Sequence, residues 1–361
     1  MNERVRLHYE KYHYPHYSLL ASVRPCDTYA LNRESLWARF NGKLPPSGKN
    51  RILLAGCGSF SPYPTSLANP KDEITALDLS RRNLSRAKIH ALLHGCFNIT
   101  WEAGDLLDNS KALGEYGFID SFGVIHHLED PLAGLRALEK RLAKGGIMRL
   151  MVYSNRGRRE AESVRKAFRL LGIKDVPSVR RLIKRADKDS RFYRYVRDSH
   201  EATFDGGLAD AFLHPCARTF RIDELMTMIG KTNLSPLLFA HTGALPDVSA
   251  EVERLCRLEK NREAVPNFII YVGRETGGGC ALAPDTRLML NPVLRDYVGA
   301  FRVGSAAVAP RLGFPNPVLD AGARRFLRKF RRPVMISALA AGELDRARPF
   351  LRAMFLFPFR Q

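Results

Sequence analysis

Several features of exported, membrane-spanning or metal-stapled proteins are missing from this sequence. Its six cysteines are scattered over 361 residues without a Cys-x-x-Cys pair, which argues against a disulfide framework and a zinc site and favours reduced thiols. No run approaches the roughly 18 apolar residues of a membrane-spanning helix, and the first ten residues lack the apolar core of a signal peptide. We therefore expect a cytoplasmic protein with no membrane insertion and no metal.

Acidic residues are scarce relative to basic ones. The chain has 57 Lys and Arg against 37 Asp and Glu, a formal net charge of +20. Residues 156–198 hold 15 basic and 6 acidic residues, and residues 275–361 hold 14 and 6. Basic surfaces attract nucleic acids and other polyanions, although a solvated cationic face has the same composition. A polyanion contact through residues 156–198 and 324–332 is one interpretation, and a solvated face is the other.

The composition is that of an ordinary globular protein with a sizeable core, since 45% of its residues are hydrophobic. Short apolar runs alternate with segments of helical periodicity, which is typical of a doubly wound, mostly parallel α/β sheet. Strands are predicted at residues 52–55, 73–80, 99–103, 118–125, 147–153, 236–240 and 267–273.

Breaks in this rhythm divide the chain. Residues 1–50 form an N-terminal arm rich in aromatic residues, and residues 51–275 form the α/β domain. Within that domain, residues 156–218 are predicted to be a basic helical insertion over the carboxyl edge of the sheet, where insertions commonly shape substrate pockets. A triple-glycine linker precedes a C-terminal accessory module at residues 281–361. In the insertion, helices are predicted near residues 160–171 and 179–198.

A glycine turn follows the first strand. Gly56 and Gly58 allow the backbone to approach a ligand closely at the carboxyl edge of a sheet. The second strand ends in Asp78, twenty residues (78 − 58) beyond Gly58, and this spacing suits a carboxylate that binds ribose hydroxyls. A nicotinamide fingerprint would need a glycine where the chain has Ser61. The turn therefore favours a nucleoside ligand of another kind.

Three further motifs occur in order along the chain: Gly104-Asp105-Leu106 after the third strand, the segment Gly123 to Pro131 after the fourth, and Lys144-Gly145-Gly146 before the fifth. Together with Ala55-Gly56-Cys57-Gly58 and Leu77-Asp78-Leu79-Ser80, they make the sequence resemble class I S-adenosylmethionine-dependent methyltransferases. The resemblance implies a seven-stranded Rossmann-like sheet, a methyltransferase domain over residues 51–275, and S-adenosyl-L-methionine as cofactor.

The resemblance also implies roles for particular residues. Gly56 and Gly58, with Ala55 and Cys57, would line the methionyl moiety; Asp78, with Leu79, would hold the ribose; Asp105 and Leu106 would face the adenine; and Gly123 and Val124 would flank the sulfonium. Two positions depart from the family pattern, because Leu54 replaces its usual acid and Phe60 its third glycine. These departures motivate an alternative, a non-catalytic RNA- or protein-binding scaffold with a degenerate cofactor site.

Candidates for catalysis and acceptor binding are fewer. His127 and His126 stand next to the expected methyl donor and are candidate general bases, although such a pair also serves structure. We expect Tyr14 and Tyr17 of the arm, Tyr153 at the end of the fifth strand, and His214 of the insertion to contact the acceptor. The basic segments allow an RNA acceptor, whereas the aromatic cluster allows a small molecule or a protein side chain, and we expect a small molecule or RNA. His90 and His94 have metal-ligand spacing, but the sequence offers them no third ligand.

Overall fold

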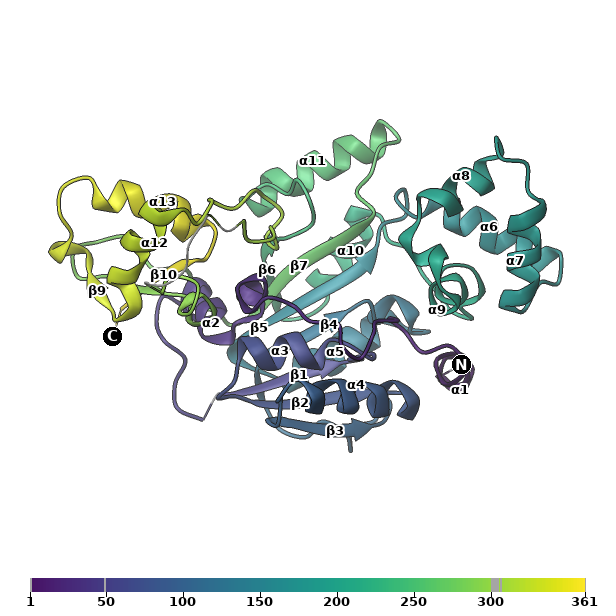
Figure 1. Cartoon of the computed structure of the whole chain (residues 1–361), viewed down its shortest axis with the longest axis horizontal. Helices are drawn as coiled ribbons and strands as arrows, with labels where there is room; N and C mark the ends of the chain where they lie inside the picture. The colour runs from purple at the N-terminus through teal and green to yellow at the C-terminus, as the bar shows by residue number, and fades with distance from the viewer. Residues whose placement is uncertain (1, 49, 300–304, 306, 361) are drawn as a thin grey trace.

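A seven-stranded sheet forms the centre of the computed structural model, which describes residues 2–48, 50–299, 305 and 307–360 (Figure 1). The strand order is β3-β2-β1-β4-β5-β7-β6. Strands β1 to β5 are parallel, and β7 is antiparallel to both of its neighbours. This arrangement confirms the predicted fold class. The strands are β1 (Arg51–Ala55), β2 (Glu73–Asp78), β3 (Ile99–Ala103), β4 (Tyr116–Phe122), β5 (Leu142–Tyr153), β6 (Leu234–Phe239) and β7 (Asn267–Arg274).

Helices cover both faces of the sheet. Alternate residues of a strand point to opposite faces, and in β1 Leu54 packs in the core beneath one helix layer while Leu53 packs beneath the other. The first layer contains α2 (Arg33–Asn41), α3 (Pro62–Ala68) and α4 (Arg81–Leu93); the second contains α5 (Pro131–Arg141), α10 (Ile222–Gly230) and α11 (Val248–Lys260).

Local sequence signals explain where α4, the helix that connects β2 to β3, begins and ends. The Ser80 side chain caps α4 by accepting a hydrogen bond from the Asn83 backbone N–H at 3.2 Å, as a serine at this position predicts. After the helix, Gly95 adopts a φ of 71°, and the N–H of Cys96 returns to the carbonyl of Ala91 at 2.9 Å. Gly95 therefore terminates the helix as predicted.

Strand β5 begins earlier than the sequence predicts. Lys144-Gly145-Gly146 lies within the strand and does not precede it: Leu142 pairs with Tyr116, Ile147 pairs with Phe118, and the register shifts between the two pairs. Gly145 has a φ of 77° in this irregularity, and a Cβ atom there would lie 2.9 Å from the Trp37 ring. The glycine is needed because the strand bulges against α2.

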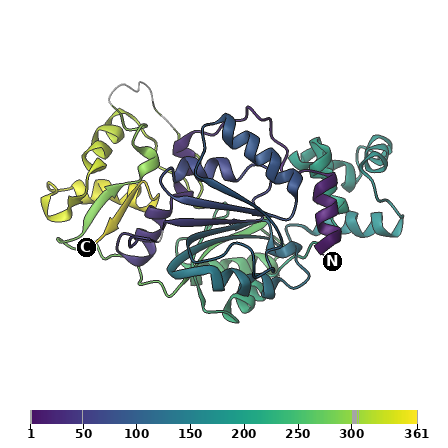
Figure 2. The ribbon, with the colours of Figure 1, turned by 90° about the horizontal axis from the view of Figure 1, so that it is seen from below.

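The insertion is a helical bundle with its own small core, which includes Phe168, Val179 and Phe212. The prediction of one helix over residues 179–198 is wrong, because Ala186 has an extended backbone and Ser190 caps a new helix at the Tyr193 N–H. Figure 2 shows α1 (Asn2–Lys11) beside this bundle. The insertion helices are α6 (Arg159–Leu170), α7 (Val176–Arg185), α8 (Arg191–Asp198) and α9 (Asp205–Leu208), followed by a π-helical turn, η4 (Ala209–Leu213).

The C-terminal segment lies at the opposite end of the molecule from the insertion (Figure 1). Its small antiparallel sheet has the order β10-β8-β9, and its core is continuous with the core on the α2 side of the main sheet, where Phe355 packs on Tyr29 with ring centroids 5.2 Å apart. Among the described residues, no helix has the length and apolar character needed to cross a membrane. The elements are β8 (Arg287–Leu290), α12 (Ala321–Arg328), β9 (Val334–Met335), α13 (Glu343–Arg352) and β10 (Leu356–Phe359).

Candidate active site

A cavity of about 420 Å³ opens at the carboxyl edge of the sheet, beyond the ends of β1 to β5. Its volume is in the range of pockets that hold cofactors and small molecules. Most of the residues predicted for the site line it, whereas Ala55, His126 and His214 do not. The predicted residues on its wall are Tyr14, Tyr17, Gly56, Cys57, Gly58, Asp78, Leu79, Asp105, Leu106, Gly123, Val124, His127 and Tyr153.

Both glycines of the turn are required by close contacts. Gly56 has a φ of 74°, and a Cβ atom on it would lie 2.5 Å from the Val124 side chain. Gly58 has a φ of 58°, and its Cβ would lie 3.0 Å from the carbonyl oxygen of Tyr14. Only glycine adopts this left-handed backbone without strain. The turn therefore brings the backbone against Val124 on one side and the N-terminal arm on the other.

Asp78 anchors the turn to the tip of β2. Its Oδ2 accepts the N–H of Gly58 at 2.7 Å, and its Oδ1 accepts the N–H of Ser80 at 2.8 Å. Burial raises the pKa of Asp78, while these two backbone hydrogen bonds act in the opposite direction. The Asn83 side chain is a third hydrogen-bond partner of the carboxylate, and since a carboxylate has about four lone-pair sites, the group can still accept a hydrogen bond from a ribose hydroxyl. Asp105 lies on the next strand tip, where it accepts the N–H of Leu107 at 2.9 Å.

The two residues that depart from the family pattern do not obstruct the cavity. Leu54 is buried in the core, in register with Asp120 of β4, and lies away from the cavity wall. Phe60 lines the cavity and packs on Tyr17 with ring centroids 4.2 Å apart. Its φ is not positive, so the turn does not require a third glycine.

The N-terminal arm forms a wall of the cavity. The Ser59 N–H donates to the carbonyl of Tyr14 at 3.2 Å, and the N–H of Tyr14 donates to the side chain of Asn83 at 3.2 Å. At the start of α4, the Arg81 N–H donates to the carboxylate of Glu10 at 2.7 Å. These bonds hold the arm across the glycine turn, so Tyr14 and Tyr17 face the cavity from a segment distant in sequence.

The other half of the cavity contains a buried carboxylate. Asp210, which is 1% exposed, accepts a hydrogen bond from the Tyr9 hydroxyl at 2.9 Å and one from the Tyr153 hydroxyl at 3.1 Å. Burial raises the pKa of both tyrosines well above the usual value, so they remain phenols. Nearby, Arg158 pairs with Glu201 at 3.2 Å and lies 4.0 Å over the Tyr153 ring.

His127 is the cavity histidine, and its tautomer is defined by a backbone contact. Its Nδ1 lies 2.8 Å from the carbonyl oxygen of Cys216, and because a carbonyl can only accept, Nδ1 carries the hydrogen. Burial lowers the pKa of His127, so the neutral ring keeps a lone pair on Nε2. A neutral histidine with a free lone pair at a cavity wall is suited to general-base chemistry.

His126 and His214 lie behind the cavity wall. The His126 ring is fully buried, with its centroid 3.9 Å from that of Tyr153, and burial lowers its pKa well below the usual value. His214 packs on His127 at 3.9 Å, and its Nδ1 accepts the N–H of Cys216 at 3.1 Å. Both histidines are therefore placed to support the wall, while the neighbouring His127 faces the cavity.

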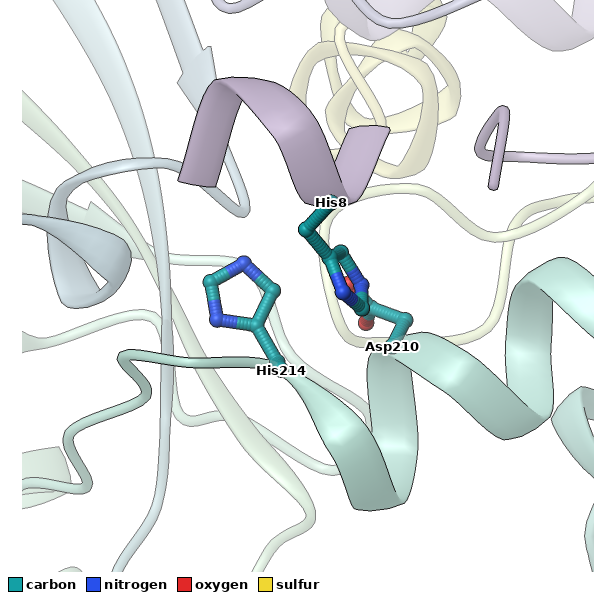
Figure 3. A group of neighbouring side chains, drawn as sticks. All are labelled: His8, Asp210 and His214. Carbon is teal, nitrogen blue, oxygen red and sulfur yellow. The ribbon is translucent and has the colours of Figure 1, made fainter. Parts of the chain in front are cut away.

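One group of side chains within the described residues has ligand atoms close enough for a metal ion: His8, Asp210 and His214, all within 4.8 Å of one another (Figure 3). The His214 Nδ1 accepts a backbone N–H, so the neutral ring carries its hydrogen on Nε2 and has no free lone pair for a metal. The group is therefore a poor metal site, and among the described residues no hydrogen-bond partner is found for the buried Nε2 atoms of His8 and His214.

Sequence reasoning missed Asp210, Glu201 and Arg158. The available signal was a single acid in the apolar run of residues 208–213, since such an acid is buried only with partners. Tyr9 stood in the aromatic N-terminal cluster but was not assigned to the site.

Comparisons with known proteins agree with this architecture. Residues 29–194 match the family described as Methyltransferase domain. The chain is 30% identical over 252 residues to an uncharacterized protein of Synechococcus sp., covering 66% of this chain and 60% of that protein. It is 33% identical over 123 residues to a ubiquinone biosynthesis O-methyltransferase of Caulobacter sp., covering 32% of this chain and 47% of that enzyme. The chain thus spans less than two thirds of either relative.

Among solved structures, PKMT2 from Rickettsia typhi has the same fold, with a TM-score of 0.57 and 14% identity over 92% of this chain and 75% of that chain. PKMT2 has also been solved in complex with AdoHcy, and that structure has a TM-score of 0.54 with this chain. Residues 29–194 are thus similar to a methyltransferase domain, and the seven-stranded sheet has the fold of PKMT2.

Proposed function

We propose that the cavity binds S-adenosylmethionine and that the protein transfers its methyl group to a small-molecule acceptor bound beside it. The observation that carries this proposal is the convergence of Gly56, Asp78, Asp105 and Val124 on one cavity, although they come from four different strand ends. The match to the methyltransferase family and the fold shared with PKMT2, which was solved with AdoHcy, support the same ligand.

The residues fit the ligand part by part. Asp78 accepts a hydrogen bond from the ribose, since its carboxylate keeps acceptor capacity beyond its two backbone N–H groups and the Asn83 side chain. Asp105 and Leu106 take the adenine side, and Gly56 and Gly58 leave room for the methionyl part. When bound, the cofactor supplies a methyl group that is already electrophilic. The protein therefore has to align the acceptor and, where needed, remove a proton.

His127 is the residue placed to remove that proton. Its Nδ1–H is held by Cys216 and its Nε2 is unprotonated. Val124, which is expected beside the sulfonium, lines the same cavity as His127. An acceptor in the half bounded by Tyr9, Tyr14 and Tyr153 would lie between the base and the methyl donor.

Of the basic segments, residues 156–198 reach this cavity through Arg158, which is paired with Glu201 at 3.2 Å. Part of the predicted polyanion surface at residues 324–332 is structural, because Arg324 is buried and donates to the carbonyl of Leu319 at 3.2 Å. The basic residues of α7 and α8 lie on the insertion. A polyanion contact there stays a prediction about docking, and an RNA acceptor is the less favoured alternative.

The proposal is tested by incubating the purified protein with S-adenosylmethionine labelled at the methyl group and with cell extract separated into metabolites, protein and RNA. We expect label in the metabolite fraction. Label in no fraction, with a folded protein that does not bind the cofactor, would favour the non-catalytic scaffold instead.

A further inference from the structure

The cavity is acidic although the protein as a whole is strongly basic. Four carboxylates line it, those of Asp78, Asp105, Glu201 and Asp210, against one guanidinium, that of Arg158. The chain carries a formal charge of +20. A carboxylate-lined cavity with low-dielectric walls concentrates cations and repels anions. The charge of the cavity therefore carries information about its ligands that the net charge of the chain hides.

At the end of the cavity lined by Tyr9, Tyr14 and Tyr153, negative charges outnumber positive ones. The guanidinium of Arg158 does not neutralise Asp210, since it pairs with Glu201 at 3.2 Å and donates to the Asn267 side chain at 2.9 Å. The hydrogen-bond partners of Asp210 are the neutral hydroxyls of Tyr9 and Tyr153, and within the described part of the chain no ion pair with a lysine or arginine reaches it. One buried carboxylate is thus left without a cation.

The nearby histidines do not supply the missing charge. His8 and His214 lie within 4.8 Å of the Asp210 carboxylate (Figure 3). Burial lowers the pKa of His8 to about 4 and that of His214 well below its usual value, so both rings are neutral near pH 7. The nearby guanidinium of Arg165 is paired with Glu162 and donates to the carbonyl of Ala211. A buried carboxylate whose hydrogen-bond partners are neutral phenols is costly. A cationic ligand would relieve that cost.

The walls around Asp210 are aromatic. Tyr9, Tyr14 and Tyr153 all line this end of the cavity, and the faces of aromatic rings attract ammonium groups, most strongly where water is excluded. From this combination we infer that the acceptor is an alkyl amine whose ammonium group binds at Asp210 between the tyrosine rings. The inference rests on the proposed function and names its substrate class. The amine belongs either to a free small molecule or to a lysine side chain.

A proton transfer followed by a methyl transfer would convert the bound ammonium into the product. The ammonium bound at Asp210 passes one proton to Nε2 of His127, which leaves a neutral amine. The nitrogen lone pair then forms a C–N bond as the methyl–sulfur bond of S-adenosylmethionine breaks, with the electron pair of that bond remaining on sulfur. The product is a methylated ammonium and a neutral thioether, and His127 returns its proton to water.

A quaternary ammonium probe tests the site without any turnover. Choline cannot be methylated at nitrogen, so its binding to the protein saturated with S-adenosylhomocysteine measures the cation site alone. We expect saturable binding that Asp210→Asn weakens about tenfold or more. Asp198→Asn is the matched control, because Asp198 is an exposed acid of the same insertion; it should leave choline binding unchanged. Equal choline binding by wild type and Asp210→Asn would overturn the inference.

Methylation assays with defined acceptors distinguish a free amine from a lysine side chain, and an amine from a neutral or an anionic acceptor. Cadaverine represents free amines, a lysine-containing peptide represents side chains, and catechol and a short RNA represent neutral and anionic acceptors. We expect methylation of cadaverine or the peptide, with Asp210→Asn raising KM for that acceptor while the Kd for S-adenosylmethionine stays within about twofold. Cofactor binding with methylation of catechol alone would overturn this inference and leave the proposed function intact, whereas methylation of RNA alone would overturn this inference and the small-molecule acceptor. Absence of cofactor binding would overturn both.

Discussion

The backbone N–H of Gly58 donates a hydrogen bond to the carboxylate of Asp78 across 2.7 Å. Gly58 follows β1 and Asp78 ends β2, so this bond joins the glycine turn to the strand tip where the ribose carboxylate is expected. The second carboxylate oxygen accepts the N–H of Ser80 at 2.8 Å. One side chain thus maintains the turn and faces the cavity, and its two roles have to be separated by experiment.

Asp78→Ala should weaken S-adenosylmethionine binding about tenfold or more, because the ribose hydroxyls lose a charged acceptor. Calorimetry measures this change. Asp247→Ala is the control, since Asp247 also accepts a backbone N–H, that of Ala250 at 2.8 Å, but caps α11 away from the cavity. Asp247→Ala should cost about 1 kcal/mol of stability, and Asp78→Ala about 1–3 kcal/mol because buried backbone donors lose their acceptor. An equal loss of affinity in the two variants would contradict the ribose role.

Gly56→Ala should destabilise the fold more than Gly172→Ala. Both glycines have a positive φ, 74° and 66°, so each alanine costs about 1–2 kcal/mol in backbone strain. A Cβ on Gly56 would also lie 2.5 Å from Val124, whereas a Cβ on Gly172 would meet nothing within 4 Å. The steric conflict adds about 1–3 kcal/mol. Urea unfolding of the two variants measures the difference, and equal losses would show that the close contact with Val124 is unimportant.

These tests concern the part of the site that could be predicted from the sequence. The glycine turn, Asp78 and Asp105 were predictable because each directly follows a strand, and the ends of parallel strands meet at one edge. The helix start at Ser80 and the helix end at Gly95 follow equally local rules. Such features depend on neighbours within a few residues.

The acceptor half was not predictable in the same way. Tyr9 and Asp210 are separated by 201 residues and meet only because the arm and the insertion both pack over the sheet edge. The tautomer of His127 depends on a carbonyl 89 residues away, at Cys216. The early start of β5 was also not predictable from neighbouring residues, since the bulge in this strand depends on the packing of Gly145 against Trp37.

His127→Gln should lower kcat about 10²- to 10⁴-fold, the usual contribution of a general base, and leave the Kd for S-adenosylmethionine unchanged. Burial lowers the pKa of His127, so the neutral, active form persists at pH values below 6.5 and the loss of kcat due to its protonation should occur only there. His16→Gln, at an exposed position, should behave like wild type. A His127→Gln enzyme with normal kcat would exclude the base role.

Stability should fall as the pH drops from about 6.5 towards 4. Burial lowers the pKa of His8 to about 4 in the folded protein, from the model-compound value of 6.5, so the unfolded chain binds the proton more tightly. The stabilisation is complete above pH 6.5 and decreases by up to about 1.4 kcal/mol per pH unit below it. Urea unfolding of His8→Phe across this range should give a shallower pH dependence than wild type, and an identical slope would contradict this assignment.

The most direct test of the central claim is calorimetric titration of the intact folded protein with S-adenosylmethionine and with S-adenosylhomocysteine. The cavity built by Gly56, Asp78, Asp105 and Val124 predicts saturable binding of each at one site per chain. The absence of binding heat from a protein shown to be folded, confirmed by equilibrium dialysis with labelled cofactor, would contradict the claim.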